Sequence, residues 1–273
     1  MKNILLLLFV LILSTSFQEK QLTWVAIGDS ITYLNEHANG TDSRITKGYM
    51  TMVTEKLPHI KYVNQGHNGW TSGEIAEEIE KLGIVKADIY SIFLGTNDWW
   101  QGRPIGTLED YKNDEGNNTV YGSFRIIVKK LRLLNPQAKI ILITPMKRVD
   151  FVQVGNMNNH AWGSYKEKNG QTLEQFAKAV DSIAKFENFP VVDLFHTKGM
   201  DYKNLVKFKR LREPGKESYR DYKYPEFVNI AFNPGKDQYP YPPDAVDITY
   251  DGLHPSDKGY EILAKKLVKI LKR

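Results

Sequence analysis

Five runs of consecutive β-prone, mainly apolar residues constrain the fold more than any other feature of this sequence. In chain order they are Trp24–Ile27, Tyr62–Asn64, Ile89–Leu94, Ile140–Ile143 and Val191–Phe195. Continuous hydrophobicity, rather than the alternation of a half-exposed strand, indicates strands that are buried on both faces. Such strands are typical of a parallel sheet covered by helices.

Helical patterns occupy the gaps between these runs. The segment that opens at Thr71 fits a capping box and then carries apolar residues at helical spacing, namely Ile75, Ile79 and Leu82. Further helices are predicted at about 121–134 and 172–186, and a last one begins after Pro255-Ser256. Strands that alternate with helices over the whole length predict an α/β fold, a three-layer α/β/α sandwich with a five-stranded parallel sheet.

The amino terminus predicts export. Residues 1–16 have the features of a secretory signal peptide, with Lys2 before the apolar stretch Ile4–Leu13 and small residues after it. The apolar stretch is too short to cross a bilayer comfortably, so we expect no stable membrane anchor after cleavage. We therefore expect a periplasmic or extracellular protein. The oligomeric state stays open.

The remaining residues, 17–273, are expected to form a single domain, which suits a chain of 273 residues with 41% hydrophobic content. Three connections are longer than this domain needs, at 99–120, 147–171 and 198–250. Long loops at a sheet edge usually shape a binding site. The third is rich in Tyr, Lys and Pro, and we expect it to be an ordered excursion packed on the domain.

Charge and histidine spacing limit the possible partners. The formal net charge is +5, and the basic run Lys203–Arg212 fits a solvated surface because no nucleic-acid module accompanies it. An acidic polysaccharide partner stays possible. No histidine has the spacing of a metal site such as H-E-x-x-H, so we expect no metal and no cofactor.

A Gly28-Asp29-Ser30 sequence directly follows the first apolar run. A serine at the end of a buried strand, beside a glycine that permits a sharp turn, has its hydroxyl exposed at the edge of the sheet. Such a serine is a candidate nucleophile, although its hydroxyl needs a base to activate it. Taken alone, the three residues are also common in ordinary turns.

Two further segments offer hydrogen-bond donors. Asn97, in Gly95-Thr96-Asn97-Asp98, follows the third run, and its side-chain amide can donate to a developing oxyanion. The loop from Asn64 to Thr71 leads from a strand into a capped helix, so the backbone N–H groups near Gly69 form a natural anion site.

Asp251 precedes His254 by three residues in a turn before the last helix. In a tight turn, this aspartate can accept from imidazole Nδ1 and leave Nε2 free to take a serine proton. A simple helix-entry turn would have the same spacing. No Gly-x-Ser-x-Gly elbow is present, because Thr32 stands where its second glycine would be, and this disfavours the α/β-hydrolase fold.

Taken together, these four blocks resemble the SGNH hydrolases, also called the GDSL esterase/lipase family. The matching residues are Gly28-Asp29-Ser30, Asn64 with Gly69, Gly95 to Asp98, and Asp251 with His254. The resemblance implies a flavodoxin-like sheet, a catalytic triad of Ser30, His254 and Asp251, and an oxyanion hole formed by Ser30, Gly69 and Asn97. Ile31-Thr32 replaces the leucine of the namesake motif.

The resemblance further implies hydrolysis of carboxylic esters through an acyl-enzyme. Long polar and aromatic loops favour a carbohydrate or polysaccharide ester, deacetylated by the enzyme, as the substrate. The residues expected to contact it are Trp99, Trp100, Arg103 and His67. Two alternatives stay open, a lysophospholipase or thioesterase and a non-enzymatic carbohydrate-binding relative.

Overall fold

The computed structural model of the chain describes residues 20–272, and the signal peptide predicted at 1–16 lies outside the described residues. Five parallel strands form the central sheet in the order β2-β1-β3-β4-β7. Their bounds are Leu22–Gly28 (β1), Ile60–Gly66 (β2), Ile89–Phe93 (β3), Lys139–Ile143 (β4) and Val191–Val192 (β7). The predicted five-stranded parallel sheet is confirmed, and its order is the flavodoxin-like one.

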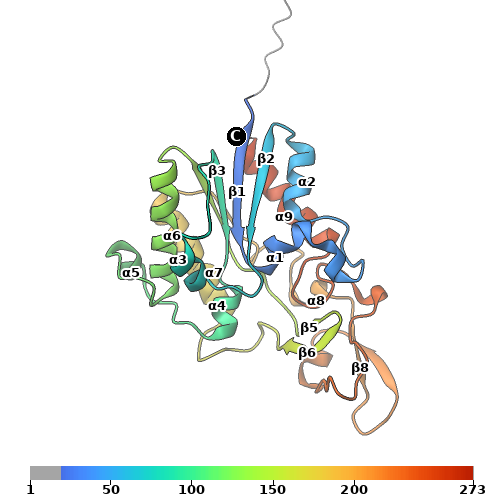
Figure 1. Cartoon of the computed structure of the whole chain (residues 1–273). Coiled ribbons are helices and arrows are strands. Elements are labelled where there is room, and N and C mark those ends of the chain that lie inside the picture. The colour runs from blue at the N-terminus through green and yellow to red at the C-terminus, as the bar shows by residue number, and fades with distance from the viewer. Residues whose placement is uncertain (1–19, 273) are drawn as a thin grey trace, which may run out of the picture.

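Helices cover both faces of this sheet (Figure 1). On one face lie α3 (Ser72–Glu78), α6 (Val120–Leu134) and α7 (Leu173–Glu187), and on the other lie α2 (Tyr49–Lys56) and α9 (Asp257–Leu271). Four shorter helices complete the set: α1 (Ser30–Tyr33), α4 (Thr96–Gln101), α5 (Leu108–Lys112) and α8 (Tyr202–Leu205). None of the helices within residues 20–272 is long and apolar enough to cross a membrane.

Strand β1 shows why the apolar runs are continuous. Trp24 and Ala26 belong to the hydrophobic cluster under α2 and α9, whereas Val25 and Ile27 belong to the cluster under α3, α6 and α7. Successive side chains of a strand point to opposite faces, so a central strand that is covered on both sides is apolar at every position.

Two elements differ from the sequence prediction. Strand β7 is only two residues long, because the N–H groups of Leu194 and Phe195 donate to Thr144 Oγ1 instead of continuing the ladder. Helix α3 ends at Glu78, and Leu82 falls in the turn that follows, where it packs against the core.

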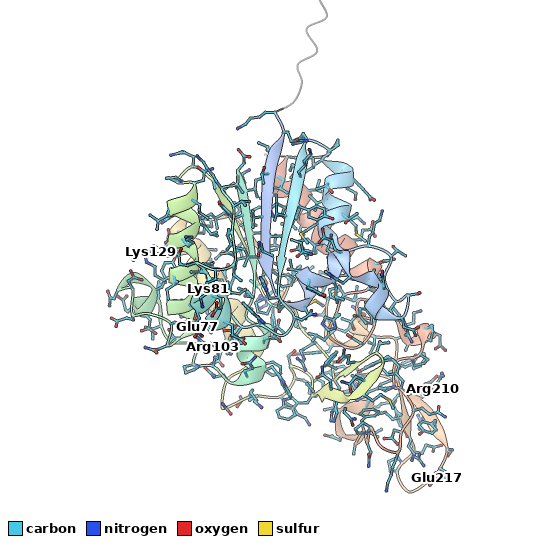
Figure 2. All side chains as sticks on the ribbon, viewed as in Figure 1. Glu77, Lys81, Arg103, Lys129, Arg210 and Glu217 are labelled. Carbon is cyan, nitrogen blue, oxygen red and sulfur yellow. The ribbon has the colours of Figure 1, made fainter. Side chains whose placement is uncertain are left out.

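Residues 198–250 pack against the sheet domain at the carboxyl end of its strands. They contain α8 and the hairpin of β8 (Lys209–Arg212) and β9 (Tyr219–Tyr222). Leu205, Leu211 and Tyr241 are buried in the same hydrophobic cluster as Trp24. A second hairpin, β5 (Phe151–Gln153) with β6 (Asn156–Ala161), lies between this lobe and the sheet. Figure 2 shows Arg210 and Glu217 at the outer part of the lobe.

Strand register brings the ends of three strands to one level. Gly28, the last residue of β1, pairs with Gly66 of β2 on one side and with Phe93 of β3 on the other. The segments that follow these strands therefore leave the sheet at the same edge. This edge is also the point where the strand order reverses, and open α/β sheets bind ligands there.

Candidate active site

Ser30 is the first residue of α1, and Asp29 caps this helix. The Asp29 side chain accepts a hydrogen bond from the Ile31 N–H at 2.9 Å. Gly28 has no room for a side chain, since a Cβ there would overlap Thr32 and lie 3.1 Å from the Phe93 carbonyl oxygen. The tight packing at Gly28 and the cap at Asp29 together fix the turn that presents Ser30. Burial raises the pKa of the Asp29 carboxyl from 3.8 to about 6.

His254 contacts both Ser30 and Asp251. The distance from His254 Nε2 to Ser30 Oγ is 2.9 Å, and the distance from His254 Nδ1 to Asp251 Oδ2 is 2.6 Å. Because a carboxylate only accepts hydrogen bonds, the proton of a neutral imidazole lies on Nδ1. Nε2 is then the acceptor that faces the serine hydroxyl.

The turn that holds these two residues is built locally. Asp251 Oδ1 accepts from the N–H groups of Leu253 at 3.0 Å and His254 at 2.7 Å, and Gly252 has a φ of +92°. Two aromatic rings fix the imidazole plane: Tyr250 stacks on it with 5.9 Å between centroids, and Phe151 packs edge-on at 5.4 Å. Asp251 and His254 are both largely buried, and both line the cavity that also contains Ser30.

Gly69 and Asn97 line the same cavity as Ser30 and His254, and this cavity has a volume of about 600 Å³. One amide N–H of Asn97 donates to the Trp70 carbonyl oxygen at 3.0 Å, which leaves its second N–H for another acceptor. Ser30 contributes the first N–H of α1, which has no intrahelical acceptor. Ser30, Gly69 and Asn97 therefore bring their donor groups to one cavity.

The two glycines of the second motif have different environments. The Gly66 N–H donates to Asn64 Oδ1 at 2.9 Å, and a Cβ on Gly66 would overlap the backbone of Tyr33. Gly69 has a φ of +76° and open space around it, and it lines the cavity. Gly66 thus lets α1 pack closely on β2, and Gly69 is the glycine that faces the cavity.

A buried carboxylate ties the loops of Gly69 and Asn97 together. Asp98, which follows Asn97 in α4, accepts from the Ser72 N–H at 2.9 Å and from Ser72 Oγ at 2.6 Å. Arg103 Nε lies 3.3 Å from Asp98 Oδ1. Desolvation raises the pKa of Asp98 above its ordinary value. The start of α3 and the start of α4 are therefore held in one arrangement.

The expected substrate contacts need correction, since only Trp100 of the four lines the cavity. Trp99 is fully buried in the core under α6 and α7. Arg103 pairs with Asp98 and donates to the Asn117 carbonyl oxygen and Ser123 Oγ. The His67 ring stacks on Trp70 with centroids 4.4 Å apart, outside the lining of the cavity.

Sequence reasoning missed most of the remaining wall. These residues come from the end of α1 and the segment after it, from the β4–β5 loop and from the hairpin β5–β6. They include Tyr33, Arg148, Phe151, Gln153 and Asn159. The one sequence signal that pointed to this wall was Arg148, a basic residue five positions beyond β4. Strand β4 ends at the same edge of the sheet as β1, so a residue shortly after it can reach the cavity. Within residues 20–272, no cluster of three His, Asp or Glu side chains could hold a metal ion.

Comparisons with known proteins agree with this geometry. A model of the GDSL-like Lipase/Acylhydrolase family matches residues 26–262. The structure of a possible lipase from Chitinophaga pinensis has 62% sequence identity and a TM-score of 0.91, over 92% of this chain and 98% of that one.

More distant structures share the fold. A lipase/acylhydrolase from Enterococcus faecalis has 19% identity and a TM-score of 0.52, over 92% of this chain and 95% of its own. An acetyl xylan esterase has 19% identity and a TM-score of 0.51, over 92% of this chain and 100% of its own. A search of curated proteins found no match.

The matched span includes Ser30, Gly69, Asn97, Asp251 and His254, and it contains every residue that lines the cavity. This chain therefore belongs to the GDSL-like lipase/acylhydrolase family and is an ester-hydrolysing enzyme.

Proposed function

We propose that this enzyme hydrolyses acetyl esters of a carbohydrate through a triad of Ser30, His254 and Asp251. The single observation that carries the proposal is the chain of hydrogen bonds from Ser30 Oγ through the imidazole to Asp251, at 2.9 and 2.6 Å. A serine hydroxyl is a weak nucleophile at neutral pH, and an imidazole oriented by a buried carboxylate supplies the base that it needs.

The reaction has two stages. Ser30 Oγ attacks the ester carbonyl carbon while His254 Nε2 takes its proton, and the imidazolium then protonates the departing alcohol oxygen. In the second stage, His254 Nε2 removes a proton from water, whose oxygen attacks the acyl carbon. The imidazolium then returns this proton to Ser30 Oγ as the acyl–serine bond breaks and the acid leaves. The proposed oxyanion donors are the N–H groups of Ser30 and Gly69 and the free amide N–H of Asn97.

The cavity lining supports a sugar ester over a long-chain lipid. Side-chain amides that can bond to hydroxyl groups lie along it, namely Asn39, Asn68, Gln101, Gln153 and Asn159. Trp100 adds an aromatic face. The acetyl xylan esterase built on the same fold indicates that such a framework accommodates a polysaccharide ester. Export to the periplasm or the cell exterior, proposed from residues 1–16, suits such a substrate.

Activity of two single variants tests the triad. Ser30→Ala and His254→Ala are expected to lower kcat for p-nitrophenyl acetate by about 10³-fold or more, because the triad acts as a unit. His67→Ala is the matched control, since His67 lies close by but outside the cavity lining. Near-full activity of either triad variant would contradict the assignment.

A panel of substrates tests which acyl group and which alcohol group the enzyme prefers. Acetylated xylan and pectin are compared with p-nitrophenyl esters of short and long acyl chains. The proposal predicts release of acetate from a polysaccharide and a preference for short acyl chains. A preference for long chains would favour a lysophospholipase or thioesterase.

A further inference from the structure

Arg148 is a buried cation in the wall of the catalytic cavity. It lies between β4 and β5, is 1% exposed and lines the same cavity as Ser30 and His254. Its guanidinium makes one hydrogen bond, from Nη2 to the Trp162 carbonyl oxygen at 2.9 Å. Within residues 20–272 its Nε finds no hydrogen-bond partner. Of the five N–H donors of this side chain, most are therefore unused.

No carboxylate among residues 20–272 forms a direct ion pair with this guanidinium, although the negative charges of Asp150 and Asp251 favour its charged form. None of the ion pairs formed among residues 20–272 includes Arg148. The two nearby acids have other partners: Asp150 Oδ2 lies 2.7 Å from Lys209 Nζ, and Asp251 binds the imidazole of His254. Burial lowers the pKa of Arg148 to about 10, so the side chain is still charged at neutral pH. A buried charge without a directly paired carboxylate is costly, because its hydrogen-bond donors have lost water without gaining a charged acceptor.

The surroundings hold Arg148 in place. The rings of Trp99 and Trp100 lie 5.4 and 5.2 Å from its guanidinium carbon, within the range of cation–π attraction. Its backbone N–H donates to Ser164 Oγ at 3.0 Å, and the next residue, Val149, donates to the Gly252 carbonyl oxygen at 3.0 Å. The loop segment that carries the guanidinium is thus bonded to the same turn that carries Asp251 and His254.

We propose that the natural substrate bears a carboxylate close to its ester and that Arg148 binds this carboxylate. The planar fork of a guanidinium matches a carboxylate and gives strong, charge-assisted hydrogen bonds. The inference rests on the proposed esterase function and narrows its substrate class to acetylated acidic sugars, such as uronic acid units. Glu36 is an acidic residue that also lines the cavity, but it is exposed. We therefore expect the carboxylate of the substrate to lie next to Arg148 rather than next to Glu36.

A matched pair of substrates tests this specificity. Methyl glycosides of glucuronic acid and of glucose, each acetylated at the same hydroxyl, differ only in the carboxylate. Wild-type kcat/KM is expected to be about tenfold or more higher for the acidic ester, the range for hydrogen bonds to a charged group. Arg148→Gln should remove this preference, and Arg148→Lys should keep part of it because the charge remains.

Lys168→Gln is the control for a general loss of positive charge. Its ammonium lies 4.7 Å from the centroid of the Trp100 ring but does not line the cavity, so the preference should persist in this variant. Equal wild-type rates on the two esters would overturn the proposal. An equal loss of kcat/KM on both esters in Arg148→Gln would also overturn the proposal, because a merely structural role of Arg148 would lower both rates together.

Binding without turnover separates this inference from the esterase function. By calorimetry, methyl glucuronoside without an ester should bind to wild-type protein more tightly than methyl glucoside, and Arg148→Gln should bind both equally. If the protein does not hydrolyse p-nitrophenyl acetate, only the proposed triad is contradicted. The calorimetric comparison still tests whether Arg148 binds the carboxylate. Equal binding of both glycosides to wild-type protein would contradict that role.

Discussion

At the scale of single residues, the site contains two buried acids, Asp251 and Asp29, whose hydrogen-bond partners differ. Asp251 is a buried acid that accepts from two backbone N–H groups and from the His254 imidazole, whereas the buried Asp29 carboxyl accepts from the backbone N–H of Ile31. The first carboxylate orients His254 through its bond to the imidazole. The second bears the cost of desolvation, which raises its pKa to about 6.

Asp29→Asn is expected to change how stability depends on pH. Between about pH 4 and 6, the folded protein keeps a proton on Asp29 that the unfolded chain has released, so rising pH through this window lowers the free energy of unfolding. Asparagine caps helices as well as aspartate and does not ionise. Between pH 4 and pH 8, the unfolding free energy of the variant should therefore rise relative to that of the wild type by up to about 3 kcal/mol.

Urea unfolding of both proteins at the two pH values measures this difference, and contributions from other titrating groups cancel in it. If Asp29→Asn and the wild type differ by the same unfolding free energy at pH 4 as at pH 8, then Asp29 does not titrate as described.

At the scale of elements, the site depends on three strands that end at one level. Ser30, Gly69 and Asn97 follow β1, β2 and β3, and the register of Gly28 with Gly66 and Phe93 brings these segments together. The close approach of α1 to β2 requires a glycine at position 66, whereas position 69 requires only a positive φ.

This contrast predicts unequal costs for the same substitution. Gly69→Ala should lose about 1–2 kcal/mol of unfolding free energy, because alanine at positive φ is strained but meets no atom. Gly66→Ala should lose much more or fail to fold, since its Cβ would overlap the Tyr33 backbone. Denaturant unfolding of the two variants checks this, and equal costs would argue against the close packing of α1 on β2.

The sequence predicted the elements with strong periodic patterns and missed those held by tertiary contacts. The five strands and the helices α3, α6, α7 and α9 follow from apolar periodicity and capping residues. Helix α2 and the hairpins β5–β6 and β8–β9 were not predicted. Strand β6, for example, reads Asn156 to Ala161 and is mostly exposed polar residues, so pairing with β5 defines it rather than its own pattern.

The site divides in the same way. Ser30, Gly69, Asn97, Asp251 and His254 carry local motif signals, and the structure brings them into contact or into one cavity. Phe151 belongs to no such motif, and Arg148 is marked only by its position shortly after β4, because folding of the β4–β5 loop over the sheet edge is what brings both residues to the cavity. Conversely, Trp99 was expected to contact the substrate together with Trp100, but it is buried in the core, because neighbouring residues of a helix point in different directions.

At the scale of the whole molecule, residues 198–250 share one core with the sheet. Leu205, Leu211 and Tyr241 are buried in the cluster that contains Trp24, and the Tyr241 hydroxyl donates to the Asp150 carbonyl oxygen. Tyr241 also approaches the place of Gly252, where an added Cβ would lie 3.0 Å from its hydroxyl. The lobe thus supports the turn that carries His254.

We therefore expect the lobe and the sheet domain to unfold together. Limited proteolysis under native conditions should not cut within 198–250 to leave a stable core, and thermal unfolding followed by circular dichroism and by tryptophan fluorescence should give one coincident transition. Early cleavage there, with the rest of the chain folded, would show that the lobe is an independent unit.

The most direct test of the central claim is covalent labelling of the nucleophile. Diethyl p-nitrophenyl phosphate reacts with an activated serine, which displaces p-nitrophenolate and forms a stable phosphoryl-serine. We predict one label per chain, located on Ser30 by peptide mass spectrometry, and no label in His254→Ala. Labelling of a different residue, or no labelling of a preparation that hydrolyses p-nitrophenyl acetate, would contradict Ser30 as the nucleophile.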